Sequence, residues 1–207
     1  MKNFPAEPFW IKGGIWKLSS FLGLHMEDAL PDDVKSLTAT DPSFGALLAL
    51  NNDHETELSR LDADRFRHLL KTAFLARHIG GAAFVLAFDQ DAGYDSPNFL
   101  WFREGFDRFV YIDRIVVSPR ARGRGYARRL YMDLFAHAAR AGHSHVVCEV
   151  NLNPPNPASD AFHAALGFRE VGCGVIHGGA KTVRYLCMEI GGQCAAPDTA
   201  EKIAQET

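Results

Sequence analysis

The segment of greatest chemical interest runs from Ile115 to Ala127 and reads Ile-Val-Val-Ser-Pro-Arg-Ala-Arg-Gly-Arg-Gly-Tyr-Ala. Its apolar start predicts a strand, and the small-residue turn that follows opens a helix. The first amides of a helix have no intrahelical partners and lie at the positive end of its dipole, so they can hold an anion. Gly123, Gly125 and Ala127 leave room for a closely approaching phosphate. Six arginines between Arg114 and Arg129, with no acidic residue among them, indicate a ligand with several phosphates.

Two familiar phosphate-binding patterns do not fit this segment. A Walker loop needs Gly-Lys-Ser/Thr after its first glycine, and the dinucleotide pattern GxGxxG needs a glycine where Arg128 stands. The segment instead resembles the acetyl-CoA loop of the GCN5-related N-acetyltransferases, in which a strand ending in Val-x-Pro leads into Arg/Gln-x-x-Gly-x-Gly/Ala. Here the match reads Val117-Ser118-Pro119, then Arg122-Gly123-Arg124-Gly125-Tyr126-Ala127. An overlapping match that starts at Arg120 fits the distance from Val117 less well.

A second stretch resembles the same family. Members typically carry an asparagine, a small residue three positions on, an apolar-aromatic pair and then Gly-Phe. Residues 156–168 read Asn-Pro-Ala-Ser-Asp-Ala-Phe-His-Ala-Ala-Leu-Gly-Phe, and only His163 departs, because the family usually has tyrosine there. The resemblance covers about residues 29–190. It implies an α/β fold with a mixed, mostly antiparallel twisted sheet, a central parallel strand pair and flanking helices, and acetyl-CoA as the acetyl donor.

The resemblance also implies which residues bind the donor. Backbone groups of Ile115 and Val117 would pair with the pantetheine arm as a further strand does. Asn156 would hydrogen-bond the pantetheine or its neighbourhood, or would serve only as the N-cap of a helix. The amides of one continuous run would bind the pyrophosphate: Arg122, Gly123, Arg124, Gly125, Tyr126 and Ala127.

Acetyl transfer to an amine poses two proton problems. The amine must be neutral to attack, and the departing sulfur benefits from a proton. His163 stands where the family has its proton-donating tyrosine, so it would donate that proton or be an ordinary helix-surface residue. Tyr111 and Asp113 share one strand face by period-2 alternation, and Glu149 lies on the next strand. Asp113 or Glu149 would be the base, although either could instead pair with an arginine such as Arg114. The backbone N–H of Val117 would stabilise the charge that develops on the carbonyl oxygen.

Hydrophobic periodicity and turn signals predict the elements that position these residues. A strand–helix–strand unit surrounds the Arg/Gly segment, with parallel strands and a right-handed crossover. Residues 89–108 are predicted to form a long aromatic loop. The expected elements are a strand at 34–39, a helix from Asp41-Pro42 to Asn51-Asn52, a helix capped by Asp62, a hairpin of 75–79 and 82–88 around Gly80-Gly81, a strand at 109–117, a helix from about Gly125 to Ala141, a strand at 146–150, a helix from Asn156-Pro157 to Leu166-Gly167, and strands at 171–176 and 182–190.

The acceptor amine is left open, as a small molecule or a peptide. In the family its pocket is built from the early helices and the strand-connecting loops, which here are the 51–61 stretch and the aromatic 94–106 loop. Aromatic residues of that loop would line an apolar pocket or pin the loop to the core: Phe99, Trp101 and Phe102. Acidic residues of the first stretch would attract a cationic amine or be solvated: Asp53, Glu55 and Glu57.

Composition limits the function classes. The 207 residues are 47% apolar and 23% charged, which is typical of a globular domain and not of a disordered chain. The net charge of −3 argues against a nucleic-acid partner, although RNA contact by the Arg/Gly segment is a competing hypothesis. The sequence has no run of 18 apolar residues, so we expect no membrane partner. Four cysteines without CxxC spacing favour a reducing, cytoplasmic setting, and no histidine pattern favours a metal.

Three regions are expected along the chain. Residues 1–25 form an extension, or an apolar arm that docks on the domain or on the second subunit of a homodimer. Residues 26–190 form the acetyltransferase domain, and residues 191–207 form a polar tail. The leading hypothesis is an acetyl-CoA-dependent N-acetyltransferase that acts by direct attack of a primary amine. The alternative is a non-catalytic acyl-CoA-binding sensor, which the histidine at 163 and the lack of a carboxylate at Tyr111 keep open.

Overall fold

A computed structural model describes residues 34–190, except residues 56 and 180. The predicted extension 1–25, the start of the predicted domain and the tail 191–207 lie outside the described residues. The elements in chain order are β1 (Val34–Ser36), α1 (Phe44–Asn52), α2 (Ala63–Thr72), β2 (Leu75–Ile79), β3 (Ala83–Asp89), α3 (Pro97–Gly105), β4 (Val110–Val117), the 3-10 turn η2 (Pro119–Ala121), α4 (Tyr126–Arg140), β5 (His145–Asn153), α5 (Pro157–Leu166), β6 (Arg169–Ile176), the 3-10 turn η3 (His177–Gly179) and β7 (Lys181–Glu189).

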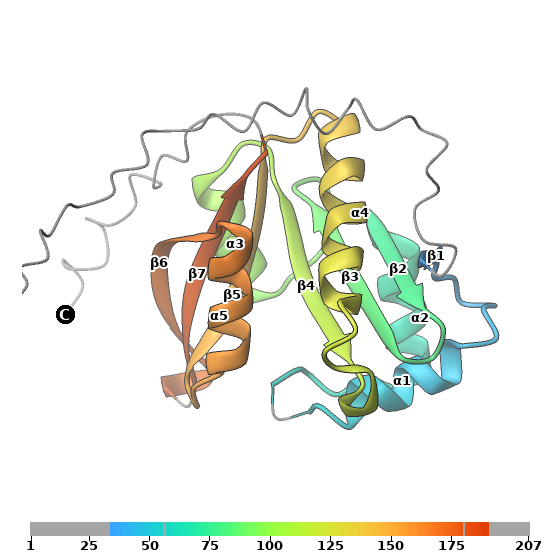
Figure 1. Cartoon of the computed structure of the whole chain (residues 1–207). Helices are drawn as coiled ribbons and strands as arrows, with labels where there is room; N and C mark the ends of the chain where they lie inside the picture. Colours follow the sequence, from blue (N-terminus) through green and yellow to red (C-terminus); the bar gives the residue numbers. More distant parts are fainter. Residues whose placement is uncertain (1–33, 56, 180, 191–207) are drawn as a thin grey trace, which may run out of the picture.

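Within residues 34–190, the described strands form one seven-stranded sheet in the order β1-β2-β3-β4-β5-β7-β6. Every neighbouring pair is antiparallel except β4 and β5, which are parallel and joined through α4. Helices cover both faces of this sheet, and α4 and α5 lie together on one of them (Figure 1). The predicted α/β fold, with its mostly antiparallel sheet and central parallel pair, is confirmed.

Two cores lie on the two faces of the sheet. The first packs α1, α2 and α3 against β3 and β4, and its largest buried side chains are aromatic: Phe66, Phe84, Phe88, Phe99, Phe102 and Tyr111. The second packs α4 and the end of α5 against the opposite face, through residues such as Leu130, Leu134 and Phe168. Residues Ala83 to Phe88 of β3 are all buried, because that strand is covered on both faces.

Two of the predicted helix starts agree with the structure, but the predicted start at Asp41-Pro42 is wrong. Helix α1 begins at Phe44 after Ser43, and the Asp41 carboxylate accepts a hydrogen bond from the Ser43 amide at 2.7 Å, before the helix. Asp62 caps α2 by accepting a hydrogen bond from the Arg65 amide at 2.7 Å. Asn156 caps α5 in the same way, since its Oδ1 accepts from the Ser159 amide at 3.2 Å. The predicted hairpin around Gly80 and the helix over residues 126–140 are also present.

The prediction of a long loop at 89–108 is wrong. Residues 97–105 form α3, which begins with Pro97 in its first turn after Ser96. Phe99 and Phe102 of this helix are fully buried, and Trp101 stacks on Tyr185 of β7 with ring centroids 4.1 Å apart. Helix α3 therefore covers the first face of the sheet and brings its polar residues to β5 and β7.

Candidate active site

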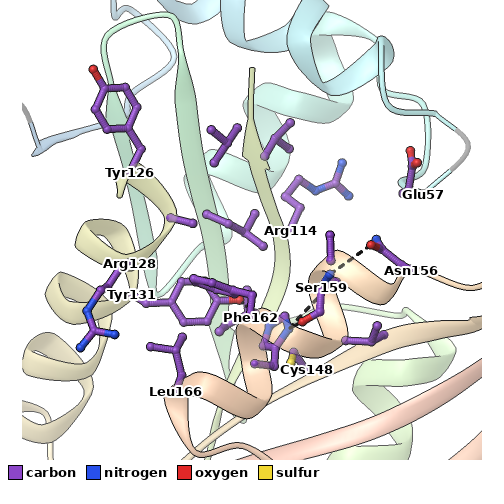
Figure 2. A pocket seen from close by; sticks show the side chains of 18 of the residues that line it. Glu57, Arg114, Tyr126, Arg128, Tyr131, Cys148, Asn156, Ser159, Phe162 and Leu166 are labelled. Atoms are coloured by element: carbon purple, nitrogen blue, oxygen red, sulfur yellow. Dashed lines mark hydrogen bonds between the residues drawn. The ribbon is translucent and has the colours of Figure 1, made fainter. Parts of the chain in front are cut away.

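The parallel strands β4 and β5 pair for only a short distance. Their register joins Val110 to Val146 and Tyr111 to Val147, although β4 continues to Val117 and β5 to Asn153. Beyond Tyr111 the strands diverge, and a cleft of about 780 Å³ opens there. Both diverging strands, the turn before α4, the helix α5 and the α1–α2 loop line this cleft (Figure 2).

One end of the cleft is the predicted anion-binding turn. Gly123 and Gly125 have φ angles of +78° and +75°, which other residues rarely adopt. Gly125 is the N-cap of α4 and provides no side chain to its first amides. Successive amides in such a turn form a concave site for an anion, so these residues fit the pyrophosphate of acetyl-CoA.

Most of the predicted donor-binding residues line the cleft, on both of its walls. Arg124 is exposed and is not among them. The predicted residues that line the cleft are Ile115, Val117, Arg122, Gly123, Gly125, Tyr126, Ala127 and Asn156.

Arg114 does not belong to this phosphate-facing group. It lines the cleft, but its buried side chain lies on the α1 side of the sheet, where Nη1 donates to Asn51 Oδ1 at 2.7 Å and Nε donates to Asp113 Oδ2 at 2.5 Å. The cause is a β-bulge: Leu86 pairs with Arg114 and Ala87 with Ile112, which leaves Asp113 as an extra residue. Of the other five arginines in the segment, Arg122 and Arg128 line the cleft.

Asp113 is fully engaged by its neighbours. Besides the ion pair with Arg114, its Oδ1 accepts a hydrogen bond from the Tyr94 hydroxyl at 2.5 Å. Burial and the adjacent Asp113 carboxylate raise the pKa of Tyr94, so this tyrosine stays a donor. Of the alternatives for Asp113, the structure shows the pairing with Arg114, and both carboxylate oxygens are occupied.

Glu149 has a different environment. Its Oε1 accepts a hydrogen bond from Asn98 Nδ2 at 2.9 Å, and its Oε2 has no hydrogen-bond partner in the part of the chain that the structure describes. Burial raises the pKa of Glu149 to about 7, although the Tyr111 hydroxyl and the Asn98 amide beside it favour the ionised form. The burial of Tyr111, near this carboxylate, raises its own pKa well above 10. Glu149 lines the cleft and can gain or lose a proton near neutral pH.

His163 is not a surface residue. Its side chain is buried between α4 and α5, and it lines the cleft. Nδ1 lies 2.8 Å from the Ser159 carbonyl oxygen, which only accepts, so Nδ1 carries the proton. Nε2 then accepts from the Tyr131 hydroxyl at 2.8 Å, and burial lowers the pKa of the ring. To reach a thiolate, His163 would have to give up one of these bonds; its role as the acid stays a prediction.

The 51–61 stretch, predicted to help form the acceptor pocket, contributes to the cleft. Three residues of this α1–α2 loop line the cleft: His54, Glu57 and Leu58. Glu55 pairs instead with Arg60 at 3.0 Å, and neither it nor Asp53 lines the cleft. Phe99, Trp101 and Phe102 pack in the core and do not line it either. Within the described residues, no cluster of His, Cys, Asp or Glu could hold a metal ion, and no helix is long and apolar enough to cross a bilayer.

Comparison with known proteins agrees with this geometry. The model of the acetyltransferase (GNAT) family matches residues 48–168, which is more than half of the chain. The chain belongs to the GNAT acetyltransferase family. GNAT proteins use acetyl-CoA, so the predicted acetyl donor is confirmed along with the fold.

Solved structures share the GNAT fold at low identity. A ribosomal-protein-alanine N-acetyltransferase from Brucella melitensis is 21% identical, with a TM-score of 0.58 over 75% of this chain and 98% of that one. A Salmonella typhimurium protein solved with its cofactor acetyl-CoA is 20% identical, with a TM-score of 0.56 over 80% and 97%. The NatC complex bound to Gag peptide and CoA is 14% identical, with a TM-score of 0.57 over 75% and 96%. A search of curated proteins finds no match.

Several residues around this GNAT site were not predicted from the sequence. Asn98 and Tyr94 come from the segment predicted to be a loop, and Tyr131 and Tyr185 carry no motif of their own. The pair Ser96-Pro97 was a usable signal, because it has the same cap-plus-proline form as Asn156-Pro157. No local signal identifies the partners that the tertiary fold brings together.

Proposed function

We propose that this GNAT protein transfers the acetyl group of acetyl-CoA to a primary amine of a small molecule or peptide, by direct attack with Glu149 as the base. The observation that carries the proposal is the state of Glu149. It is a cleft-lining carboxylate with a pKa of about 7, one oxygen held by Asn98 and one without a partner among the described residues. Asp113 is the weaker candidate, because Arg114 and Tyr94 occupy both of its oxygens.

The residues divide the reaction between them. The turn at Gly123 and Gly125 holds the pyrophosphate, and the thioester then extends toward the point where β4 and β5 diverge. Glu149 takes a proton from the incoming ammonium, and the neutral nitrogen forms the new C–N bond as the C–S bond breaks. The thiolate leaves with the bonding electron pair and is protonated afterwards. His163 stays a predicted donor for that last proton, and the Val117 amide a predicted donor to the carbonyl oxygen.

Peptide α-amines are the first acceptors to try. Two of the similar structures are named for an N-acetyltransferase of ribosomal-protein alanine and for a complex with a peptide and CoA. Glu57 and Glu149 line the acceptor end of this cleft, so an acceptor that enters as a cation is favoured. The panel therefore pairs alanine-starting peptides with small diamines.

The test is release of free CoA thiol with each amine, for the wild type and for Glu149→Gln. We expect the substitution to lower kcat/KM by about 10²- to 10⁴-fold, the usual range for a general base, and to leave the Kd for acetyl-CoA unchanged. Glu104→Gln, an exposed carboxylate on α3, is the matched control and should match the wild type. Full activity of Glu149→Gln would contradict the assignment. Acetyl-CoA binding without turnover on any amine would favour the sensor.

A further inference from the structure

A hydrogen-bonded chain runs from β7 through α3 to Glu149. The Tyr185 hydroxyl donates to Asn98 Oδ1 at 3.2 Å, and Asn98 Nδ2 donates to Glu149 Oε1 at 2.9 Å. The carboxylate can only accept, so the amide must turn its NH₂ toward Glu149 and its oxygen toward Tyr185. Asn98 and Tyr185 are both buried, and the chain joins three elements that are far apart in the sequence.

The packing around Tyr185 keeps this chain in place. Its ring stacks on Trp101 of α3 with an interplanar angle of 19°. A Cβ at Gly174 of β6 would lie 2.5 Å from the Tyr185 hydroxyl oxygen, and one at Gly172 would lie 2.7 Å from the Trp101 ring. Glycine at these two positions therefore leaves space for both aromatic side chains against the edge strand.

We propose that Asn98 is a positioning residue for the base Glu149, and that Tyr185 orients the Asn98 amide. This inference rests on the proposed function, because it assigns Asn98 a role only through Glu149. The neutral amide fixes Oε1, while Oε2 is buried and has no hydrogen-bond partner among the described residues. Asp113 is held by the cation Arg114 instead, so the two acids of the cleft receive different partners.

The neutral partner Asn98 influences the pKa of Glu149. The titratable groups that face Glu149 are Tyr111 and Asp113 of β4, Tyr94 of the β3–α3 loop and Tyr185 of β7, with Cys148 adjacent on β5. The cation Arg114 lines the same cleft but is paired with Asp113. Of the interactions that favour the ionised carboxylate, the Tyr111 hydroxyl contributes most and the hydrogen bond from Asn98 comes next. Without it, Glu149 would hold its proton to higher pH and would be a working base only in more alkaline solution.

The experiment is a pH titration of the Glu149 carboxyl carbon by NMR in ¹³C-labelled full-length protein, with Glu149→Gln to assign the signal. A hydrogen bond to a charged group contributes enough to move a pKa by roughly one to two pH units. In Asn98→Leu we therefore expect the midpoint to rise by about one unit or more, and in Tyr185→Phe by less. The rising limb of kcat/KM against pH should move equally, with the alkaline plateau within about threefold of wild type.

Controls separate positioning from general damage. Phe106→Leu loosens packing at the C-terminal end of α3 without removing a polar contact, and should leave the midpoint unchanged. Asn98→Leu could fail to fold, and Tyr185→Phe then provides the test by its own shift. A midpoint within about 0.3 unit of wild type in the folded variants overturns the inference. A shifted midpoint with fully active Glu149→Gln would instead overturn the proposed function and leave the contact intact.

Discussion

The two ends of the cleft are built in different ways. Apart from Asn156 at the start of α5, the end predicted to bind the acetyl donor comes from one continuous run, from Ile115 in β4 to Ala127 in the first turn of α4. The end that faces the acceptor is assembled from the α1–α2 loop, α3, the bulge in β4, and strands β5 and β7. A phosphate site can be made from backbone amides within one turn, whereas a base needs an environment that distant segments supply.

The two ends also differ in their expected effect on the stability of the protein. The donor end uses backbone amides, and its arginines at 122, 124 and 128 are exposed to solvent. The acceptor end buries Arg114 with Asp113, and Glu149 has no cationic partner within the residues that the structure describes. Taking a carboxylate out of water without a compensating charge is unfavourable, so the acceptor end should lower the stability of the protein.

The largest expected effect is a gain in stability when this charge is removed. The pKa of Glu149 is raised by burial from 4.5 to about 7, so the folded state binds the proton more tightly than the unfolded state. The wild type should therefore lose stability as the pH rises from about 4.5 to 7 and should not regain it above that range, with an upper limit of about 3 kcal/mol. Glu149→Gln should lack this loss. Urea unfolding at pH 5 and pH 9 measures it.

For each protein, the free energy of unfolding at pH 9 is subtracted from that at pH 5, and the differences are compared. Any effect of the glutamine that does not depend on pH then cancels. Glu104→Gln should keep the pH dependence of the wild type, because that carboxylate is exposed. If the free energy of unfolding had the same pH dependence in the wild type and in Glu149→Gln, burial of Glu149 would not destabilise the protein.

The donor end should respond to a change in one turn. Gly125→Ala places a side chain at a φ of +75°, where an L-residue is strained by about 1–2 kcal/mol, and the new methyl group points into open space at the start of α4. We expect the Kd for acetyl-CoA to rise by about tenfold or more, while the pKa of Glu149 does not move. Isothermal titration calorimetry measures the first and the carboxyl titration the second.

Gly80→Ala is the matched control. Gly80 also has a positive φ, +51°, with open space around it, but it lies in the β2–β3 turn and does not line the cleft. Gly80→Ala should therefore destabilise the protein by a similar amount and leave the Kd for acetyl-CoA unchanged. Equal affinity loss in both variants would mean that stability, and not the geometry of the turn, governs donor binding.

The same contrast explains how far the sequence alone could go. The strand, turn and helix of the donor end are local, so residue types and spacing within residues 115–127 predicted them. Helix α3 was missed although Ser96-Pro97 marks its start, and residues 89–108 were predicted to form one long aromatic loop. The pattern of polar and apolar residues in α3 does not reveal its buried side either, because the polar Asn98 is buried together with Phe99 and Phe102.

Partners that are distant in sequence could not be predicted at all. Asn98 and Glu149 are 51 residues apart, and Arg114 and Asn51 are 63 apart. The bulge that turns both Asp113 and Arg114 to one face also breaks the period-2 alternation beyond Asp113, on which a strand prediction depends. The strand pattern therefore identified Asp113 and Glu149 as candidate acids, but the different partners of the two carboxylates follow only from the tertiary packing.

The smallest expected effect concerns the hydrogen bond between Tyr131 and His163, which joins α4 at the donor end to α5. Tyr131→Phe removes the hydroxyl that donates to His163 Nε2, the only donor to that atom among the described residues. We expect a loss of about 1 kcal/mol in the free energy of unfolding, as for one hydrogen bond, and a kcat within about threefold of wild type. Urea unfolding and steady-state kinetics measure the two quantities.

His163→Gln tests whether His163 is the acid that protonates the thiolate, because glutamine keeps polar atoms but cannot act as an acid. A large fall in kcat in His163→Gln alone would assign the thiolate's proton to His163, whereas a large fall in Tyr131→Phe as well would extend the proton path to the tyrosine and join the two ends of the cleft in one proton pathway.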